Sequence, residues 1–344
     1  MKSLRIAALA ACWLMTATLS RAADDTIKKV GEPPVRCSIS SITKDEVKYS
    51  KSGKDETVPT YDIESIRLAD EPPQLNPARN QVINGAYENA LKQLDKIDAD
   101  TLDRPEVKAE VQYMRAYSNG RLALGGSGDV IEAGRQVKAF IDANPNSCHF
   151  YAANELAGDL LVALGKYEAA TTFYKALSAA PANAYKIRSG IDTGRAKLAE
   201  KKYEDALKEF DTALTLAESS KTPESQKLSA MLGKASCLAQ TGQPEEGVKL
   251  AESVVAKLPP EEVDLHAWAY VVLGNCYRQM PDHTKQALLA FLHVDVLYFS
   301  NPQLHAEALW NLASLWQELK KIDRMTQAAN LLRERYPNST WAKM

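Results

Sequence analysis

The residues best suited to catalysis or metal binding are five histidines, and their spacing does not form a known active site. They are His149, His266, His283, His293 and His305. A helical zinc protease needs two histidines four residues apart with an adjacent glutamate, and no pair here has that spacing. Cys148 and His149 are adjacent, but no further ligands follow at the spacing that zinc requires. The sequence therefore predicts no enzyme: no catalytic residue, no metal site and no cofactor.

Two other motifs that could bind a charged ligand also have simpler explanations. Gly125-Gly126-Ser127-Gly128 lacks the Lys-Ser/Thr of a phosphate loop and lies between two helical patterns, which predicts a flexible turn. The acid pairs Glu245-Glu246 and Glu261-Glu262 follow prolines at predicted helix starts. Acidic side chains there complement the helix dipole, so we expect these pairs to stabilise helices.

The overall charge argues against nucleic acid as a partner. The 344 residues are 45% hydrophobic and 25% charged, with a formal net charge of −2. Beyond the first 22 residues, 39 basic residues face 44 acidic ones, a balance of −5. Proteins that bind nucleic acid displace its counterions with clustered Lys and Arg, and no such excess is present.

The amino-terminal residues have the pattern of a secretory signal. Met1 to Arg5 is short and basic, Ile6 to Leu19 is almost wholly apolar, and Ser20-Arg21-Ala22 places small residues at positions −3 and −1. This predicts a signal peptide over 1–22, with an uncleaved anchor as the alternative. The mature chain is then expected to be exported, periplasmic or envelope-associated, without a stable membrane span.

Four cysteines remain beyond the signal segment. Cys37, Cys148, Cys237 and Cys276 make an even number, which in an exported protein permits disulfides. Cys237 and Cys276, however, lie near the middle of the first helices of two successive helix pairs. Equivalent sites in stacked repeats are usually too far apart for a disulfide, so free buried thiols are favoured for this pair.

A small β module over 26–70 precedes the helical patterns. Val47 and Tyr49 alternate with polar neighbours, as do Val35, Cys37 and Ile39. Alternation bounded by turn residues is typical of half-buried antiparallel strands, and this length holds four or five of them. The module resembles the small SH3-like modules found ahead of helical repeats in some exported bacterial proteins. Because it is marginal alone, we expect it to pack on the first helices.

One pattern then recurs along the rest of the chain: a Gly or polar residue, an aromatic, a small residue three positions on, and a large apolar residue four further. The clearest copy is Gly165-Lys166-Tyr167 with Ala170 and Tyr174. The equivalent positions are 36 to 43 residues apart, and all but the last are small: Ala90, Ala133, Ala170, Ala206, Gly247, Ala287 and Met325.

These residues resemble the tetratricopeptide repeat. Leu273-Gly274-Asn275-Cys276-Tyr277 has its Leu-Gly-x-x-Tyr core, and Leu312-Ala313-Ser314-Leu315-Trp316 is a variant of it. Prolines stand at or near the repeat ends at positions 145, 181, 259 and 337. The resemblance covers 76–344 and implies about seven helix pairs, with a spacing longer than the usual ~34 residues. The predicted fold is mostly α: a solenoid of helix hairpins preceded by a small antiparallel β module.

Close helix packing follows from the same residues. Gly158 and Gly274 allow paired helices to approach, and Tyr174 and Phe291 fill the space beside them. No pair buries its apolar face alone, so neighbouring pairs must stack into a curved array.

The resemblance also implies where a partner binds, because the first helix of each pair lines the concave face in this family. Matched position by position, the candidate binding residues are Arg188, Arg195, Trp268, Asn275, Arg278, Trp310, Asn311 and Gln317. Glu155 and Asp159 fall on the same face. Trp and Arg are enriched at binding hot spots. The alternative is that Trp268 and Trp310 are core aromatics of amphipathic helices. The carboxylate clamp of some members is incomplete, since Val271 stands where a lysine is needed.

These observations favour an exported scaffold that binds a protein or peptide partner on its concave face, in envelope assembly or organisation. The alternative is a structural, self-assembling envelope protein without a peptide ligand, because a solenoid has free stacking faces at its ends and a homo-oligomer is possible. A third hypothesis is an enzyme or carbohydrate binder that uses the β module, whose role no motif assigns.

Overall fold

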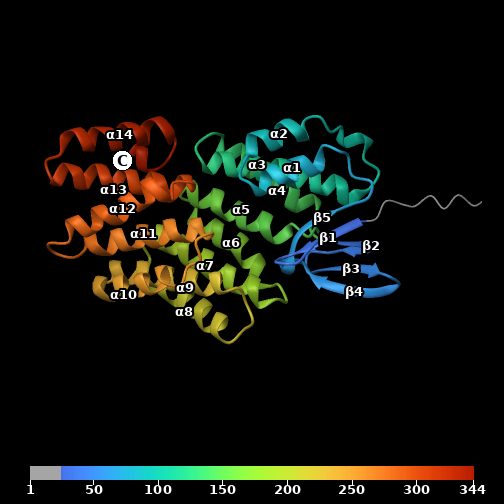
Figure 1. Ribbon diagram of the computed structural model, residues 1–344, viewed down its shortest axis with the longest axis horizontal. Helices are drawn as coiled ribbons and strands as arrows, with labels where there is room; N and C mark the ends of the chain where they lie inside the picture. The colour runs from blue at the N-terminus through green and yellow to red at the C-terminus, as the bar shows by residue number, and fades with distance from the viewer. Residues whose placement is uncertain (1–24) are drawn as a thin grey trace, which may run out of the picture.

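The computed structural model describes residues 25–344, so the predicted signal segment 1–22 lies outside the described residues. The described chain begins with a five-stranded antiparallel sheet, drawn in blue in Figure 1, in the order β4-β3-β2-β1-β5. The strands are β1 (Asp25–Lys29), β2 (Val35–Ile42), β3 (Glu46–Lys51), β4 (Lys54–Pro59) and β5 (Ile63–Arg67). A small antiparallel sheet ahead of the helices is the predicted arrangement.

The sheet has its own core, and the predicted alternation builds it. Val47 and Tyr49 of β3 are buried, while Lys48 between them is exposed. The pairing of β2 with β3 shifts register between Ile39 and Ser41. Such a bulge breaks strict alternation, and both Ile39 and Ile42 therefore pack against the sheet core.

Fourteen helices follow among the described residues, arranged as seven hairpins. The first helices of the pairs are α1 (Leu75–Ile83), α3 (Pro105–Leu124), α5 (Phe150–Ala163), α7 (Asn183–Ala199), α9 (Glu224–Gln240), α11 (Val263–Arg278) and α13 (Pro302–Glu318). The second helices are α2 (Tyr87–Leu94), α4 (Val130–Ala143), α6 (Tyr167–Ser178), α8 (Tyr203–Glu218), α10 (Pro244–Val255), α12 (Thr284–Leu297) and α14 (Ile322–Arg335). The predicted fold class, a tetratricopeptide-like solenoid after a small β module, is confirmed.

The turn inside each hairpin contains a residue in the left-handed region, which explains the first position of the repeated pattern. Four of these residues are glycines: Gly85, Gly126, Gly165 and Gly242. The other three are Lys201, Asp282 and Lys320, with φ of 63°, 61° and 58°. A left-handed residue ends a helix by satisfying its last carbonyl groups, and glycine adopts that conformation at least cost.

Glycines of the first helices receive aromatic rings from the second helices. A β-carbon at Gly158 would lie 2.2 Å from the Tyr174 ring, and one at Gly274 would lie 2.5 Å from the Phe291 ring. Both rings are almost completely buried. The expected close approach of paired helices is therefore confirmed at these two positions, and any larger residue there would force the helices apart.

The seven equivalent positions on the second helices lie in the core, with one exception. Met325 of α14 is partly exposed, because no further pair stacks on the last hairpin. The remaining members of the series are buried: Ala90, Ala133, Ala170, Ala206, Gly247 and Ala287. Cys237 and Cys276 lie on successive first helices as buried free thiols, and burial raises the pKa of each to about 12.

The sheet packs beyond the first hairpins. The Tyr151 hydroxyl of α5 donates to Asp45 at 2.7 Å, and Tyr185 of α7 lies 3.2 Å from the Thr60 hydroxyl, measured oxygen to oxygen. Arg104, just before α3, pairs with Asp25 of β1 at 3.2 Å. These contacts reach the second, third and fourth hairpins, which is more than the expected packing on the first helices alone.

The hairpins wind into a superhelix whose two ends meet. Figure 1 shows α13 and α14, in red, beside the hairpins α1 to α4, in cyan and green. The side-chain amide of Asn338 donates to the carbonyl of Gly126 at 3.1 Å, which joins the turn after α3 to the segment after α14. The glycine-rich turn thus joins two helices, as predicted, and also contacts the far end of the chain.

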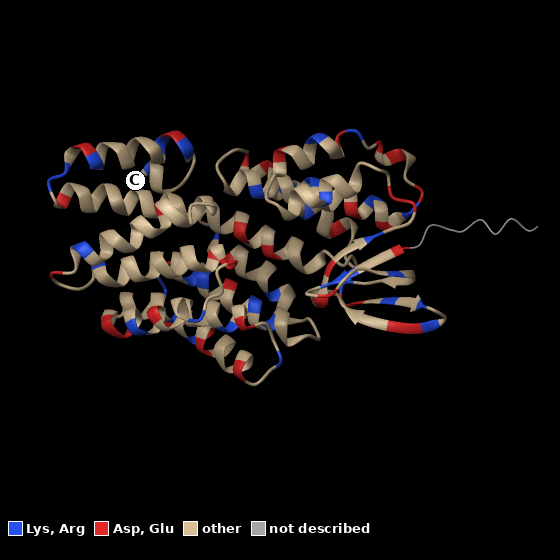
Figure 2. Ribbon diagram, in the orientation of Figure 1, with Lys and Arg blue, Asp and Glu red and all other residues tan. Residues whose placement is uncertain are grey.

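The surface carries both signs of charge. Figure 2 shows Lys and Arg interspersed with Asp and Glu over the sheet and the helices. Within residues 25–344, no helix combines the length and the apolar character that crossing a bilayer demands.

Candidate functional site

The first helices of six consecutive hairpins line one groove, with a cavity of about 410 Å³. Helices α3, α5, α7, α9, α11 and α13 or the turns beside them contribute its lining, so it follows the inner face of the superhelix. The charged and aromatic side chains that line it are Arg121, Glu155, Asp159, Arg188, Asp192, Arg195, Asp264 and Trp268. We call this surface the central groove.

Two arginines of α7 are held in place along the central groove. Arg188 forms an ion pair with Glu155 of α5. The Arg195 guanidinium lies 5.2 Å from the centroid of the Trp268 ring on α11. A guanidinium over an indole face is a favourable cation–π contact. These contacts connect the third, fourth and sixth hairpins and present a mixed aromatic and charged wall.

Two carboxylates lie deeper in the groove. Asp159 of α5 accepts a hydrogen bond of 2.8 Å from the Tyr174 hydroxyl. Asp192 of α7 is only 7% exposed, and its Oδ2 atom has no hydrogen-bond partner. Burial and the nearby Asp159 carboxylate raise the pKa of Asp192 to about 7, although Arg195 and Arg188 act in the opposite direction. Burial also raises the pKa of Asp159.

The structure brings three of the predicted binding residues together. Arg188, Arg195 and Trp268 line the central groove, along with Glu155 and Asp159. Trp268 also packs against the core between α9 and α11, so it is both a groove residue and a partly buried core aromatic.

The other predicted residues form a second group toward the carboxyl end. The Arg278 guanidinium donates to the Asn311 side-chain oxygen at 2.5 Å and lies 5.7 Å from the Trp310 ring centroid. Trp310 packs against Trp341, with ring centroids 5.3 Å apart, and Gln317 is exposed.

The side chains of the two asparagines in this group, Asn275 and Asn311, form hydrogen bonds within the protein. Asn275 donates to Glu307 Oε1 at 2.9 Å. Asn311 is 2% exposed, and its amide donates to the Glu307 carbonyl at 2.9 Å. Their side chains connect α11 to α13, so the structure places them as contacts between hairpins rather than as open groups on the concave face.

Sequence reasoning missed Arg121 and Asp192. Arg121, Asp159 and Arg195 each follow directly after the glycine of a first helix, so the register of Asp159 and Arg195 also identifies Arg121. Asp192 lies two residues before Gly194, and no sequence signal separates it from a core position.

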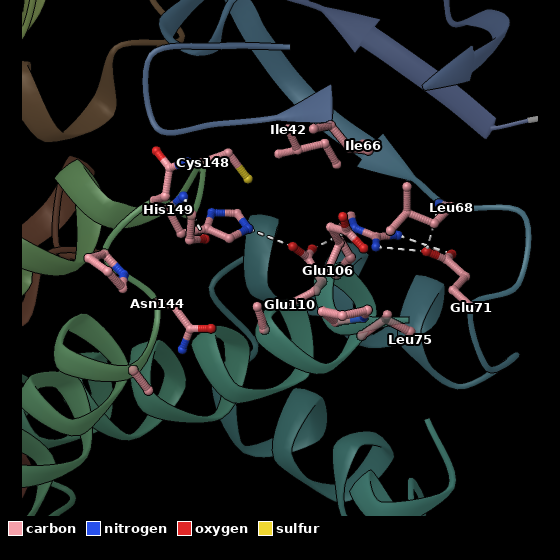
Figure 3. A pocket seen from close by; sticks show the side chains of 17 residues that line it. Ile42, Ile66, Leu68, Glu71, Leu75, Glu106, Glu110, Asn144, Cys148 and His149 are labelled. Atoms are coloured by element: carbon pink, nitrogen blue, oxygen red, sulfur yellow. Dashed lines mark hydrogen bonds and ion pairs between the residues drawn. The ribbon is translucent and has the colours of Figure 1, made fainter. Parts of the chain in front are cut away.

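A second cavity, of about 260 Å³, lies where the sheet meets α1, α3 and the turn before α5. Ile42, Ile66 and Leu68 form its apolar wall, and Figure 3 shows His149 directed toward Glu110 across the floor. We call the buried ionic groups there the seam network: Glu71, Arg79, Glu110 and His149.

Every member of the seam network has a charged partner. Glu110 accepts from Arg79 at 3.2 Å and from His149 at 2.5 Å, and Arg79 also donates to Glu71 at 2.9 Å. Burial opposes the charge on Glu110, but His149 and Arg79 lower its pKa to about 2. Burial also opposes the imidazolium, yet Cys148 and Glu110 raise the pKa of His149 to about 10. This arrangement joins the sheet to the helices and offers no free group to a ligand.

Comparison with known proteins defines the fold. No protein-family model and no curated protein matches the sequence. A tetratricopeptide repeat protein from Parabacteroides merdae superposes with a TM-score of 0.52 at 15% identity, over 76% of this chain and 91% of that one. A Rap protein in complex with Competence and Sporulation Factor superposes with a TM-score of 0.55 at 14% identity, over 78% of this chain and 76% of that one.

The fold is that of a tetratricopeptide-like solenoid. At these identities the likeness concerns the arrangement of helix pairs and not the groove residues. Among residues 25–344, the solenoid contains no group of three or more His, Cys, Asp or Glu side chains placed to hold a metal ion.

Proposed function

We propose that this protein is an exported, non-enzymatic scaffold that binds a peptide or an extended protein segment in the central groove, in envelope assembly or organisation. The observation that carries the proposal is the convergence of six first helices on one groove lined by Trp268, three arginines and four carboxylates. Aromatic and arginine side chains at the centre of a concave surface are the usual anchors of a protein partner. The amino-terminal signal pattern is the support for export.

The neighbouring structures point the same way. The Rap protein of similar fold was solved in complex with Competence and Sporulation Factor, so a solenoid of this kind accommodates a second molecule. The groove here mixes charged, polar and aromatic groups along several hairpins, which suits a ligand that contacts many of them in succession.

Cross-linking in the native cell followed by mass spectrometry tests this function. Wild-type protein is expected to capture a partner whose cross-links map to the central groove, and Arg195→Met is expected to lose it while retaining its helical circular dichroism. Lys138→Met, at an exposed ion pair on α4, is the control and should keep the partner. Capture of the same partner at the same level by Arg195→Met would contradict a groove-based role.

Export has its own test. Mass spectrometry of the protein purified from the envelope fraction is expected to show an amino terminus at Ala23. An intact Met1 would support the anchor alternative, and recovery in the cytoplasmic fraction would remove export from the proposal.

A self-assembling role is a second candidate, supported by an apolar surface on α12 and the turn after it. Leu289, Val296, Leu297 and Phe299 are 50% to 62% exposed. Exposed apolar groups that gather in one place are typical of association surfaces. Light scattering should then show a concentration-dependent mass that Val296→Asp abolishes, whereas a monomer at all concentrations would exclude this candidate.

A further inference from the structure

Asp192 is the most buried of the four carboxylates that line the central groove, and the protein supplies no donor to one of its oxygens. The Gln226 amide oxygen in the same groove also lacks a donor. Asp192 is 93% buried, its Oδ2 atom has no hydrogen-bond partner, and it lines the 410 Å³ cavity. A buried carboxylate oxygen without a donor has lost its hydrogen bonds to water, and no hydrogen bond within the protein replaces them. A ligand that brings a donor to this oxygen recovers that loss.

The cations nearest to Asp192 are already engaged. Arg188 is paired with Glu155, and Arg195 is held over the Trp268 ring. Asp159, the other deep carboxylate, accepts from the neutral Tyr174 hydroxyl at 2.8 Å, and burial raises its pKa although Arg195 and Arg121 act in the opposite direction. The groove is lined by four carboxylates against three guanidiniums, so its charge balance favours a positive ligand group.

We infer that the central groove binds a cationic amine or guanidinium of its peptide ligand, with Asp192 as the primary acceptor and Asp159 as the second. This inference rests on the proposed peptide-binding function and deepens it by naming the group that is recognised. An N–H cation fits better than a neutral donor, because it satisfies the hydrogen bond and the charge together. It fits better than a metal ion, because two carboxylates are too few ligands for a protein-bound calcium or magnesium site.

The chemistry has two sources, a Lys or Arg side chain and a free amino terminus. A synthetic random heptapeptide library screened against the full mature chain tests both. Half of the library carries a free amino terminus and half is acetylated. We expect the bound peptides to be enriched in Lys or Arg at one position, in both halves, if a side chain is the source. Enrichment confined to the free-amine half would identify the amino terminus.

Affinities of the selected peptides are then measured by calorimetry for wild type, Asp192→Asn and the control Asp55→Asn. Asp55 is exposed on β4, and its replacement changes the net charge by the same amount. Asp192→Asn should weaken binding about 10- to 100-fold, as expected for loss of a hydrogen bond to a charged group. Replacing the selected Lys or Arg by norleucine should weaken wild type by a similar factor and leave Asp192→Asn almost unchanged.

The outcomes separate this inference from the proposed function. Peptides that bind without any basic group, or that bind Asp192→Asn as tightly as wild type, would overturn the cation site and leave peptide binding intact. Failure to select any peptide in either half would overturn both. Circular dichroism of Asp192→Asn confirms that a loss of binding is not a loss of fold.

Discussion

The seam network and the central groove both bury carboxylates beside arginines, yet they leave those charges in different states. In the seam network, Glu110 accepts from Arg79 and His149 together, and its pKa falls to about 2. In the groove, Asp192 has one oxygen without a donor, and its pKa rises to about 7. The same residue types therefore have all their charges paired in one place and leave a carboxylate oxygen without a donor in the other.

Glu110 and Asp192 differ in which parts of the chain can supply them with hydrogen-bond donors. The seam network draws on the segment after β5, on α1, on α3 and on the turn before α5, which surround Glu110 from several directions. Asp192 lines the groove between the first helices of several hairpins, and none of the described residues donates to its Oδ2 atom. Stacked hairpins that curve around a groove can thus leave a carboxylate unpaired, whereas the seam network pairs each of its charges.

The largest expected effect comes from breaking the seam network. Glu110→Gln removes the negative charge that Arg79 and His149 share. We expect the free energy of unfolding to fall by about 3–5 kcal/mol, measured by urea denaturation. Glu106→Gln is the matched control, because Glu106 lines the same cavity with a side chain that is 43% exposed. Equal losses in the two variants would show that the buried pairing does not set stability.

His149→Gln tests the same network through pH. The fold raises the pKa of His149 from 6.5 to about 10, so its contribution is complete below pH 6.5 and is lost as the pH rises through 10. The variant should be less stable than wild type by about 2–3 kcal/mol at pH 6, and the gap should close toward pH 10. His293→Gln is the control for the loss of ring stacking, because His293 stacks on Tyr270 as His149 stacks on Tyr113, and none of the described ion pairs includes His293.

Asp192→Asn is expected to raise the free energy of unfolding, whereas the substitutions in the seam network lower it. The fold raises the pKa of Asp192 from 3.8 to about 7, so the carboxylate costs stability as the pH rises through this range. The variant should be more stable than wild type by about 1–2 kcal/mol at pH 8, with no gain below pH 4. Thermal unfolding across this pH range measures the effect, with Asp55→Asn as the control. A variant that is less stable at pH 8 would mean that Asp192 is satisfied in the free protein.

The smallest effect is expected at the surface. Lys138 and Asp142 form an exposed ion pair one turn apart on α4, at 2.7 Å. Lys138→Met should lower the free energy of unfolding by only about 0.3–0.5 kcal/mol, and the difference should vanish in 1 M salt. A loss as large as that of Glu110→Gln would mean that burial does not distinguish these pairs.

The sequence was sufficient for the hairpins because their signals are local. A turn residue such as Gly165, followed by Tyr167 and Ala170, specifies the helix end, the next helix start and the close contact within a few residues. The strand alternation around Val47 is local in the same sense. The domain limits 26–70 and 76–344 and the binding role of the eight candidate residues stay predictions.

The groove was less predictable because it depends on the winding of the array. The small rotation between successive hairpins decides that Arg121 of α3 shares a cavity with the start of α13. The position of a residue along a first helix shows which face its side chain is on. It does not show whether that side chain already forms a hydrogen bond with a neighbouring hairpin. Asn311 lies on the expected face, yet its side chain is already hydrogen-bonded to Arg278 and to the Glu307 carbonyl.

The hydrogen bond between Asn338 and Gly126 has a consequence for how a partner reaches the groove. It joins the turn after α3 to the segment after α14, so a partner of the kind proposed that entered between these two segments would have to break it. This bond itself contributes about 0.5–1.5 kcal/mol, and Gly125 and Gly126 also lie close to Pro302 and Tyr336. A contact of this size would slow such an entry without preventing it, so it would change the rate of binding more than the final affinity.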